Sequence, residues 1–273
     1  MRGWFLSYRK HKFIVCYYCT VTQKITMSLS LTFKRKFKTI FLRFNLHRIT
    51  EPFTGALLNL AYISKFSAWR AQNNNPAYND FYLADWDYDK RYKLYEFILG
   101  HEKLDQPVNY LEFGVCEGHS FRWWLKNNKD ASSRFYGFDT FTGLPEQWDQ
   151  FKAGDMSTNG NLPDVNGDTR VEFLKGLFQE TVPEFLKQFD NSRRKIIHLD
   201  ADLYSSTLYT LASLEPFLKE GDILIFDEFG VPTHEFLALM NYQSAFRREV
   251  ELIAAANNYF FTAFKVKGLK KGF

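Results

Sequence analysis

Apolar runs alternate with amphipathic stretches over most of the chain beyond residue 108. Short apolar runs that predict strands cover residues 108–113, 134–138, 171–174, 195–199 and 222–227. Helical spacing of apolar positions predicts helices over residues 119–127, 180–189, 205–218 and 233–247. Strands that alternate with helices in this way form a parallel sheet with helices on both faces. We therefore expect a doubly wound α/β domain, Rossmann-like in its architecture.

The last two predicted strands differ from the others because no helix separates them. Glu249–Ala256 and Tyr259–Val266 are rich in β-formers, and only Asn257 and Asn258 lie between them. This pattern is typical of an antiparallel hairpin. With the five preceding strands, it gives a mostly parallel, seven-stranded sheet.

Helical patterns also precede the first strand, over residues 51–70 and 88–100, with an Asn-rich loop over residues 72–80 between them. We place the start of the α/β domain at residue 88, so that it covers residues 88–273. Residues 1–87 are then an N-terminal extension that supplies a helical lid or an interface.

A glycine turn follows the first strand of the domain, in the sequence Tyr110–Ser120. Gly114 and Gly118 lie between an apolar strand and a helical pattern. Such a turn brings backbone N–H groups and a helix N-terminus to one point, where a nucleotide-like ligand can bind. Two glycines alone are weak support, because many α/β loops contain them.

Acidic residues stand at the ends of three further strands. Asp139 ends the second strand, about 20 to 25 residues beyond the turn, where an acidic side chain reaches ribose hydroxyls. Asp200 and Asp202 end the strand at 195–199, and the pair Asp227 and Glu228 ends the strand at 222–227. Because parallel strands end at one edge of a sheet, these carboxylates are expected to form a single site.

Basic residues are concentrated in the extension. Residues 1–50 contain eleven Lys or Arg and no Asp or Glu, so a chain of net charge +4 leaves −7 for residues 51–273. The basic balance is therefore no sign that the globular part binds nucleic acid. Residues 33–48 alternate basic and aromatic residues at helical spacing. We expect their Phe face to pack on the main domain or on a second subunit of a homo-oligomer, in preference to a membrane surface.

Residues 1–26 differ in composition from the rest of the chain. Their apolar run, Phe13–Val21, contains Cys and Tyr residues and is followed by no small-residue cleavage site. It is also far shorter than the roughly 20 residues that span a bilayer, so we predict no transmembrane helix. Met27 begins a more ordinary N-terminal sequence, which suggests the hypothesis that residues 1–26 are not translated.

Three cysteines define neither a zinc site nor a disulfide framework. Cys16 and Cys19 lack a second pair, and Cys116 in the glycine turn is most simply a small buried residue. A chain without predicted disulfides is typical of a reducing compartment, so a cytoplasmic location is expected.

Three motifs stand in one order along the chain: Glu112–Phe121, Phe135–Glu146 and His198–Thr207, the last followed by Phe226–Glu228. Over roughly residues 88–250 the chain thereby resembles the macrocin O-methyltransferase (TylF-type) family. The resemblance implies the class I methyltransferase fold, S-adenosylmethionine as methyl donor, and a divalent cation such as Mg2+ that holds a sugar hydroxyl. A parallel sheet that ends in an antiparallel hairpin agrees with that fold better than with a dehydrogenase.

The same resemblance implies roles for individual residues. Glu112 and Gly114 would lie by the methionine part of the cofactor and Asp139 by its ribose. The remaining cofactor-binding residues would be Val115, Gly118, Ser120 and Thr140. Metal ligands would be Asp200, Asp227 and Glu228. Two positions depart from the family: His119 stands where a second glycine is usual, and Glu228 replaces an aspartate.

Transfer of a methyl group from a sulfonium to a hydroxyl requires alignment and a base that accepts the proton. Asp202 and His234 are the candidates, while His198, inside a strand, is more simply a buried histidine with satisfied hydrogen bonds. The long loop at residues 143–168 is of the kind that closes over substrates.

Other functions are compatible with some of the same residues. Asp200-Ala-Asp202 also fits the D-x-D motif of metal-dependent glycosyltransferases, although that scheme gives the glycine turn and Asp139 no role. A non-catalytic cofactor-binding subunit is a second alternative. A dinucleotide oxidoreductase is a third, weakened by the incomplete glycine fingerprint.

Overall fold

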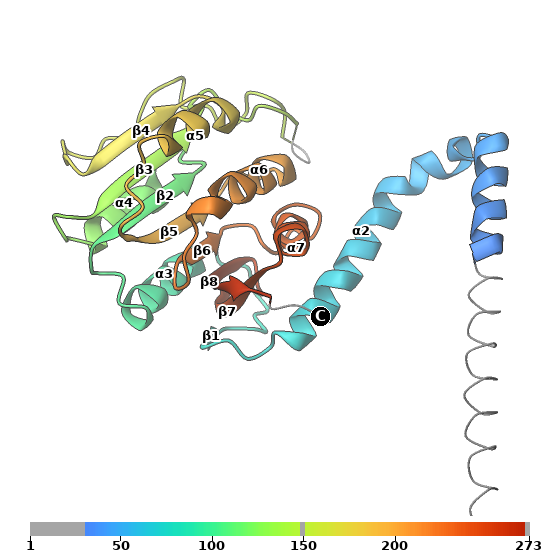
Figure 1. Cartoon of the computed structure of the whole chain (residues 1–273), viewed down its shortest axis with the longest axis horizontal. Coiled ribbons are helices and arrows are strands. Elements are labelled where there is room, and N and C mark those ends of the chain that lie inside the picture. The colour runs from blue at the N-terminus through green and yellow to red at the C-terminus, as the bar shows by residue number, and fades with distance from the viewer. Residues whose placement is uncertain (1–30, 148–150, 271–273) are drawn as a thin grey trace, which may run out of the picture. The chain divides into compact units, whose positions relative to one another are not determined.

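Residues 31–147 and 151–270 are described by the computed structural model. The chain divides into two units, of which the first ends at Leu58 and the second begins at Asn59 (Figure 1). In the first unit, residues 31–43 are helical, and helix α2 (His47–Gln72) begins there and ends in the second unit. None of the helices in these described stretches has the length and apolar character that crossing a bilayer requires. The hypothesis about residues 1–26 lies outside the described residues.

The second unit is built on one mixed sheet. Its strands are β1 (Tyr78–Asn79), β2 (Val108–Phe113), β3 (Arg134–Asp139), β4 (Val171–Lys175), β5 (Arg194–Leu199), β6 (Ile223–Phe226), β7 (Arg248–Ala256) and β8 (Phe261–Leu269). The order across the sheet is β1-β7-β8-β6-β5-β2-β3-β4, in which only β8 runs antiparallel to its two neighbours. The mostly parallel sheet with a terminal antiparallel hairpin is confirmed.

The sequence pattern did not predict one of the strands, β1. β1 comprises two residues within the predicted loop at 72–80 and pairs in parallel with β7, so the sheet has eight strands and not seven. Two residues are too few to show an alternation of apolar and polar positions. The hairpin loop between β7 and β8 has four residues and not the predicted two. Tyr259 and Phe260 belong to this loop, and β8 starts at Phe261.

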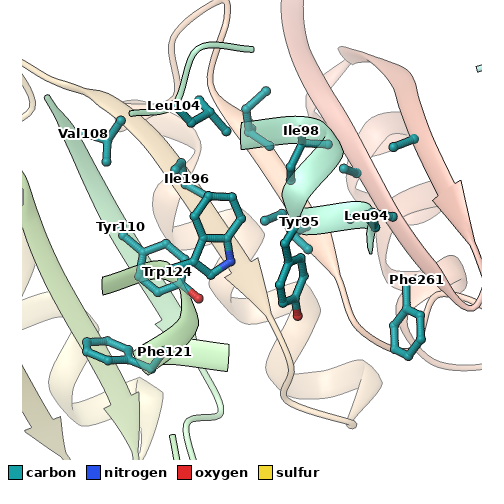
Figure 2. Packing of buried hydrophobic residues seen from close by; sticks show 14 of the residues in the cluster. Leu94, Tyr95, Ile98, Leu104, Val108, Tyr110, Phe121, Trp124, Ile196 and Phe261 are labelled. Carbon is teal, nitrogen blue, oxygen red and sulfur yellow. The ribbon is translucent and has the colours of Figure 1, made fainter. Parts of the chain in front are cut away.

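Helices cover both faces of the sheet. They are α3 (Lys90–His101), α4 (His119–Asn127), α5 (Phe178–Leu186), α6 (Tyr204–Leu214), the short 3-10 helix η1 (Glu215–Phe217) and α7 (Glu235–Phe246). The core follows this layering. On one face Tyr110 of β2 and Ile196 of β5 pack with Tyr95 of α3 and Trp124 of α4, and the rings of Tyr95 and Tyr110 both lie 5.6 Å from Trp124 (Figure 2).

Side chains that alternate with these point to the opposite face. There Leu111 and Ile197 pack with α5, α6 and α7. The end of α2 joins this second cluster: Trp69 contacts Phe229 at 5.1 Å and Phe236 at 5.7 Å between ring centroids. Residues between Asn59 and residue 87, which we assigned to the extension from the sequence, therefore pack within the compact unit.

Replacing Trp69 with Ala tests this packing. We expect Trp69→Ala to lower the free energy of unfolding by roughly 2 to 3 kcal/mol, because it removes a partly buried aromatic side chain from the second core cluster. Phe33→Ala is the matched control, since Phe33 is 71% exposed and its removal should cost less than about 0.5 kcal/mol. Urea unfolding of the full chain measures both. Equal stabilities of the two variants would contradict the role given to Trp69.

Candidate active site

The glycine turn after β2 needs glycine at two positions for steric reasons. Gly114 has φ +92°, and a Cβ there would lie 1.8 Å from the carbonyl oxygen of Asp200. Gly118 has φ +73°, caps α4, and a Cβ there would lie 2.7 Å from Pro163 Cβ. The turn thus packs directly against the end of β5 and against the loop at 143–168. Only glycine allows so close an approach at these two positions. His119, the departure from the family pattern, is the first residue of α4 and pairs with Glu117 at 3.0 Å.

Asp139 holds this turn in place. Its Oδ2 accepts hydrogen bonds from the backbone N–H groups of Val115 and Cys116, both at 2.7 Å, and its Oδ1 accepts one from Phe141 N–H at 2.7 Å. A carboxylate that receives three backbone N–H groups is a strong, charge-assisted anchor. The acidic residue at the end of β3 therefore fixes the shape of the turn.

A cavity of about 530 Å3 opens where β2, β3, β5 and β6 end. Of the residues expected in a site, it is lined by Gly114, Val115, Gly118, Ser120, Asp139, Thr140, Asp200, Asp202 and Glu228. The structure thus brings together nearly all the residues that the strand ends predicted. Its size suits a small-molecule or cofactor site.

Glu112 lies beneath the turn and not at the cavity wall. It is fully buried, and its carboxylate accepts hydrogen bonds from Ser120 Oγ at 2.6 Å and from the Tyr110 hydroxyl. Its Oε2 lies 3.6 Å from His198 Nδ1. Glu112 therefore supports Ser120 at the start of α4 from below, and it forms an ion pair with a buried imidazole.

Asp227 occupies the other side of the same imidazole. Its Oδ1 lies 3.6 Å from His198 Nε2 and accepts a hydrogen bond from the Tyr95 hydroxyl at 3.0 Å. Its Oδ2 accepts a hydrogen bond from Arg91 at 3.2 Å, and Arg91 also donates to the Tyr88 hydroxyl at 3.0 Å. Burial alone would raise the pKa of Asp227, but the neighbouring His198 and Arg91 hold that pKa below its usual value.

His198 is the cation between these two carboxylates. Burial would lower the pKa of its imidazole, but the neighbouring carboxylates of Asp227 and Glu112 raise that pKa to about 9. The ring also contacts the hydroxyls of Tyr95 at 3.2 Å and Tyr110 at 2.9 Å. A buried imidazolium with a partner at each nitrogen agrees with the structural role that the sequence favoured for His198.

Three other carboxyl groups face the cavity without a cation partner of this kind. Burial and the neighbouring Asp227 and Asp202 raise the pKa of Asp200. Burial, Asp227 and Asp139 raise the pKa of Asp202 to about 7. Burial, Asp202 and Asp227 raise the pKa of Glu228 to about 9. At the end of the cavity formed by β5 and β6, burial and the neighbouring carboxylates therefore favour the neutral, protonated form of these groups, and a bound cation would favour their ionised form.

The three residues implied as metal ligands are not equivalent. Asp200 and Asp227 each offer a ligand atom within 4.8 Å of the other, and the third member of that group is His198, not Glu228. Glu228 faces the cavity, and its Oε2 is buried with no hydrogen-bond partner among the described residues. Its backbone N–H donates to the buried Glu235 at 2.9 Å. The carboxylate oxygens of Asp200 and Glu228 are the donor type that a hard divalent cation prefers.

The two candidate bases differ in position. Asp202 lines the cavity, with a left-handed backbone conformation of φ +60° that turns the chain before α6. His234 is the N-cap residue of α7, and it is not among the residues that line the cavity. Of the two, only Asp202 faces the space in which a substrate could react.

Cys116 of the glycine turn and part of the loop at 143–168 also contribute to the cavity wall. Cys116 is half-buried and lines the cavity, which corrects the expectation of a simply buried thiol, and burial raises its pKa. Of the loop at 143–168, Gly143–Glu146 and Met156 border the cavity. The loop folds back on the end of β3, where Gly160 N–H donates to the Phe141 carbonyl at 2.7 Å.

Sequence reasoning missed three residues that donate hydrogen bonds to Asp227. Arg91, Tyr88 and Tyr95 all come from α3 or the residues just before it, more than 130 positions earlier in the chain. Arg91 is buried although it is an arginine, and its guanidinium lies 4.2 Å from the centre of the Tyr88 ring. The only signal in the sequence is the cluster of Tyr and Arg at one end of a helix with few other distinguishing features.

The strand order β4-β3-β2-β5-β6, continued by antiparallel β8 and β7, with a glycine turn and an acidic cavity at the strand ends, is the fold of the class I methyltransferases. A family model described as a methyltransferase domain matches residues 111–229, which contain the glycine turn and all three acidic strand ends. The crystal structure of CalS11, a calicheamicin methyltransferase, has the same fold, with a TM-score of 0.51 and 23% identity over 63% of this chain and 77% of that one.

One curated relative has a recorded substrate in its name. It is the 8-demethyl-8-(2,3-dimethoxy-α-L-rhamnosyl)-tetracenomycin-C 4'-O-methyltransferase of Streptomyces olivaceus, 30% identical over 147 residues, or 46% of this chain and 54% of that enzyme. The chain thus matches about half the length of this relative.

Breaking the buried pair of Arg91 and Asp227 should strongly destabilise the fold. Arg91→Met keeps the apolar stem but leaves Asp227 without its guanidinium, so we expect the free energy of unfolding to fall by roughly 3 kcal/mol. Lys187→Met is the control, because Lys187 and Glu184 form an exposed pair 2.7 Å apart on α5 and its capping residue. Such pairs contribute about 0.5 kcal/mol or less. Thermal and urea unfolding would contradict the buried-pair interpretation if both variants were equally stable.

Proposed function

We propose that the protein is an S-adenosylmethionine-dependent O-methyltransferase that methylates a hydroxyl of a sugar, a glycan or a glycosylated natural product. The observation that carries the proposal is one cavity bordered on one side by the glycine turn, which Asp139 holds, and on the other by three carboxyl groups with raised pKa values. The rhamnosyl acceptor in the relative's name and the resemblance to the TylF-type family support the sugar as acceptor class.

The cofactor would bind across the turn. The N-terminus of α4 offers backbone N–H groups to the carboxylate of the methionine part, next to Gly118 and Ser120. Asp139 and Thr140, at the end of β3, would lie by the ribose. The positively charged sulfonium would favour the ionised form of the cavity carboxyl groups and would be attracted by it, because charges interact more strongly where water is partly excluded. Val115 completes the turn, while Glu112 acts from beneath by holding Ser120.

Mg2+ would be held by the carboxylates of Asp200 and Glu228, with Asp227 as the third ligand. Asp227 already binds Arg91, so the guanidinium would compete with the metal for this carboxylate. When bound, a divalent cation lowers the pKa of a hydroxyl that it contacts.

Asp202 is the base that we propose. With the cofactor and acceptor bound, the Asp202 carboxylate would accept the proton of the acceptor hydroxyl as that oxygen takes the methyl group from the sulfonium, which would leave as the neutral thioether. Asp202 suits this task because its carboxyl group lines the cavity in which the acceptor hydroxyl would lie. His234, at the start of α7, remains the alternative candidate. A D-x-D glycosyltransferase would use Asp200 and Asp202, but it would leave the turn held by Asp139 without a function.

Calorimetric titration with S-adenosylmethionine and S-adenosylhomocysteine, with and without Mg2+, tests whether the protein binds the proposed cofactor. We expect both to bind the full chain, and Asp139→Ala to weaken binding at least about tenfold, because the substitution removes two hydrogen bonds to the turn and a third to Phe141, each of which contributes about 1 kcal/mol or more. Asp105→Ala, an exposed aspartate after α3, is the control. If the folded protein binds neither compound but binds a sugar nucleotide, the D-x-D alternative replaces the proposal.

Measurements of turnover test which residue acts as the base. With rhamnosides as acceptors, Asp202→Asn should lower kcat roughly 100-fold or more, because general-base catalysis contributes about that factor. Its affinity for S-adenosylmethionine should stay within about threefold of the wild type, since the isosteric amide keeps the shape of the cavity. The rate of S-adenosylhomocysteine formation is the measurement, and His234→Asn is compared in parallel. Loss of turnover in His234→Asn with normal turnover in Asp202→Asn would assign the base to His234.

A further inference from the structure

A continuous apolar stripe runs along the helix at residues 31–43. It consists of Phe33, Phe37, Ile40 and Phe41, continued by Phe44 just after the helix, at the i, i+4, i+7, i+8 and i+11 spacing of one helix face. Neighbouring rings contact along the stripe, with 6.4 Å between Phe33 and Phe37 and 6.0 Å between Phe37 and Phe41. Phe33, Phe37, Ile40 and Phe44 are each more than half exposed.

The first part of α2 repeats this arrangement. Ile49, Phe53 and Leu57 follow one another at four-residue spacing on one face, and each is again more than half exposed. No residue of α2 is buried. The described part of the first unit, up to Leu58, therefore consists of helical segments whose apolar faces have no core of their own.

Cationic side chains flank the stripe. Residues 31–50 contain six Lys or Arg and no acidic residue, and the first acidic side chain is Glu51. In helical projection Lys34 and Lys38 lie along one edge of the stripe and Lys36 and Arg43 along the other. A face of aromatic and aliphatic side chains with cations along both edges is the pattern of a helix that lies in the plane of a membrane interface.

We infer that residues 31–57 bind an anionic lipid surface, with the Phe stripe in the boundary between headgroups and acyl chains and the flanking cations on the lipid phosphates. The sequence alone favoured packing on the main domain or on a second subunit. The charge pattern disfavours a second copy, because joining two such stripes would bring the cationic edges together with no acidic residue in residues 31–50 to compensate them. Repulsion of this kind is costly at short distances.

Packing on the main domain would need an apolar surface of similar length. Within the described part of residues 64–273, the exposed large apolar side chains lie in separate segments, and the largest group is Phe81, Tyr82, Trp86 and Tyr88. That group is a short loop and not a groove. Lipid is therefore the occupant that satisfies both the apolar stripe and its cationic edges.

Vesicle co-sedimentation of the full chain tests the inference. The probes are vesicles of phosphatidylcholine alone and of phosphatidylcholine with one third phosphatidylserine. We expect binding only to the anionic vesicles, weakened strongly by raising the salt concentration, because each cation near such a surface contributes about 1 kcal/mol. The triple variant Lys34→Gln, Lys36→Gln, Lys38→Gln should bind roughly 100-fold more weakly, and Phe37→Ser with Phe41→Ser at least about tenfold.

A charge-matched control is Lys103→Gln, Lys126→Gln, Lys129→Gln, which removes three exposed lysines from the second unit. It should bind anionic vesicles as the wild type does. Circular dichroism melting of all variants checks that they fold, and light scattering measures their oligomeric state. Absence of binding to anionic vesicles, or equal binding to neutral ones, overturns the inference. So does a concentration-dependent dimer that the paired Phe→Ser substitutions convert to a monomer.

Discussion

The structure of the site depends on one buried arrangement of charges, in which the imidazole of His198 lies between the carboxylates of Glu112 and Asp227. The three residues come from β2, from its neighbour β5 and from the end of β6, and Glu112 and His198 are direct partners in the ladder. An isolated buried charge would cost several kcal/mol, so these charges require one another. Tyr95, Tyr110 and Arg91 supply the remaining hydrogen bonds and link α3 to the sheet.

This arrangement divides the acidic residues at the strand ends into two kinds. Asp227 and Glu112 are compensated from below, where their partners come from buried side chains. Asp200, Asp202 and Glu228 face the cavity, and mutual repulsion together with burial raises their pKa values. A group with a raised pKa gains from any cation that approaches it. The cavity is thus prepared for a positively charged ligand, which agrees with a sulfonium cofactor and with a divalent cation and disagrees with an uncompensated anion.

The sequence predicted those strands and helices whose own residues show a recognisable pattern of apolar positions. Strands β2, β5 and β6, buried on both faces, and the hairpin were visible as apolar runs, and Asp139, Asp200, Asp202 and Glu228 were found because they end such runs. β1 was missed because two residues carry no periodicity. Arg91 and Tyr95 were missed because their partner, Asp227, lies more than 130 residues away and only the folded sheet brings them together. The same limit explains Trp69, whose place in the core depends on helix packing rather than on local spacing.

The distribution of charge along the chain sets one further constraint. Residues 59–273 contain 24 Lys or Arg and 30 Asp or Glu, so this unit would by itself be repelled by an anionic surface. A unit of 215 residues has a radius of gyration of about 17 Å, whereas electrostatic interactions are screened over about 8 Å at physiological ionic strength. Most of its negative charge is therefore too far from a surface to oppose six cations held within a few ångströms of lipid phosphates. Association with an anionic surface and an acidic, cation-binding cavity can thus coexist in one chain, because each depends on charges within its own screening distance.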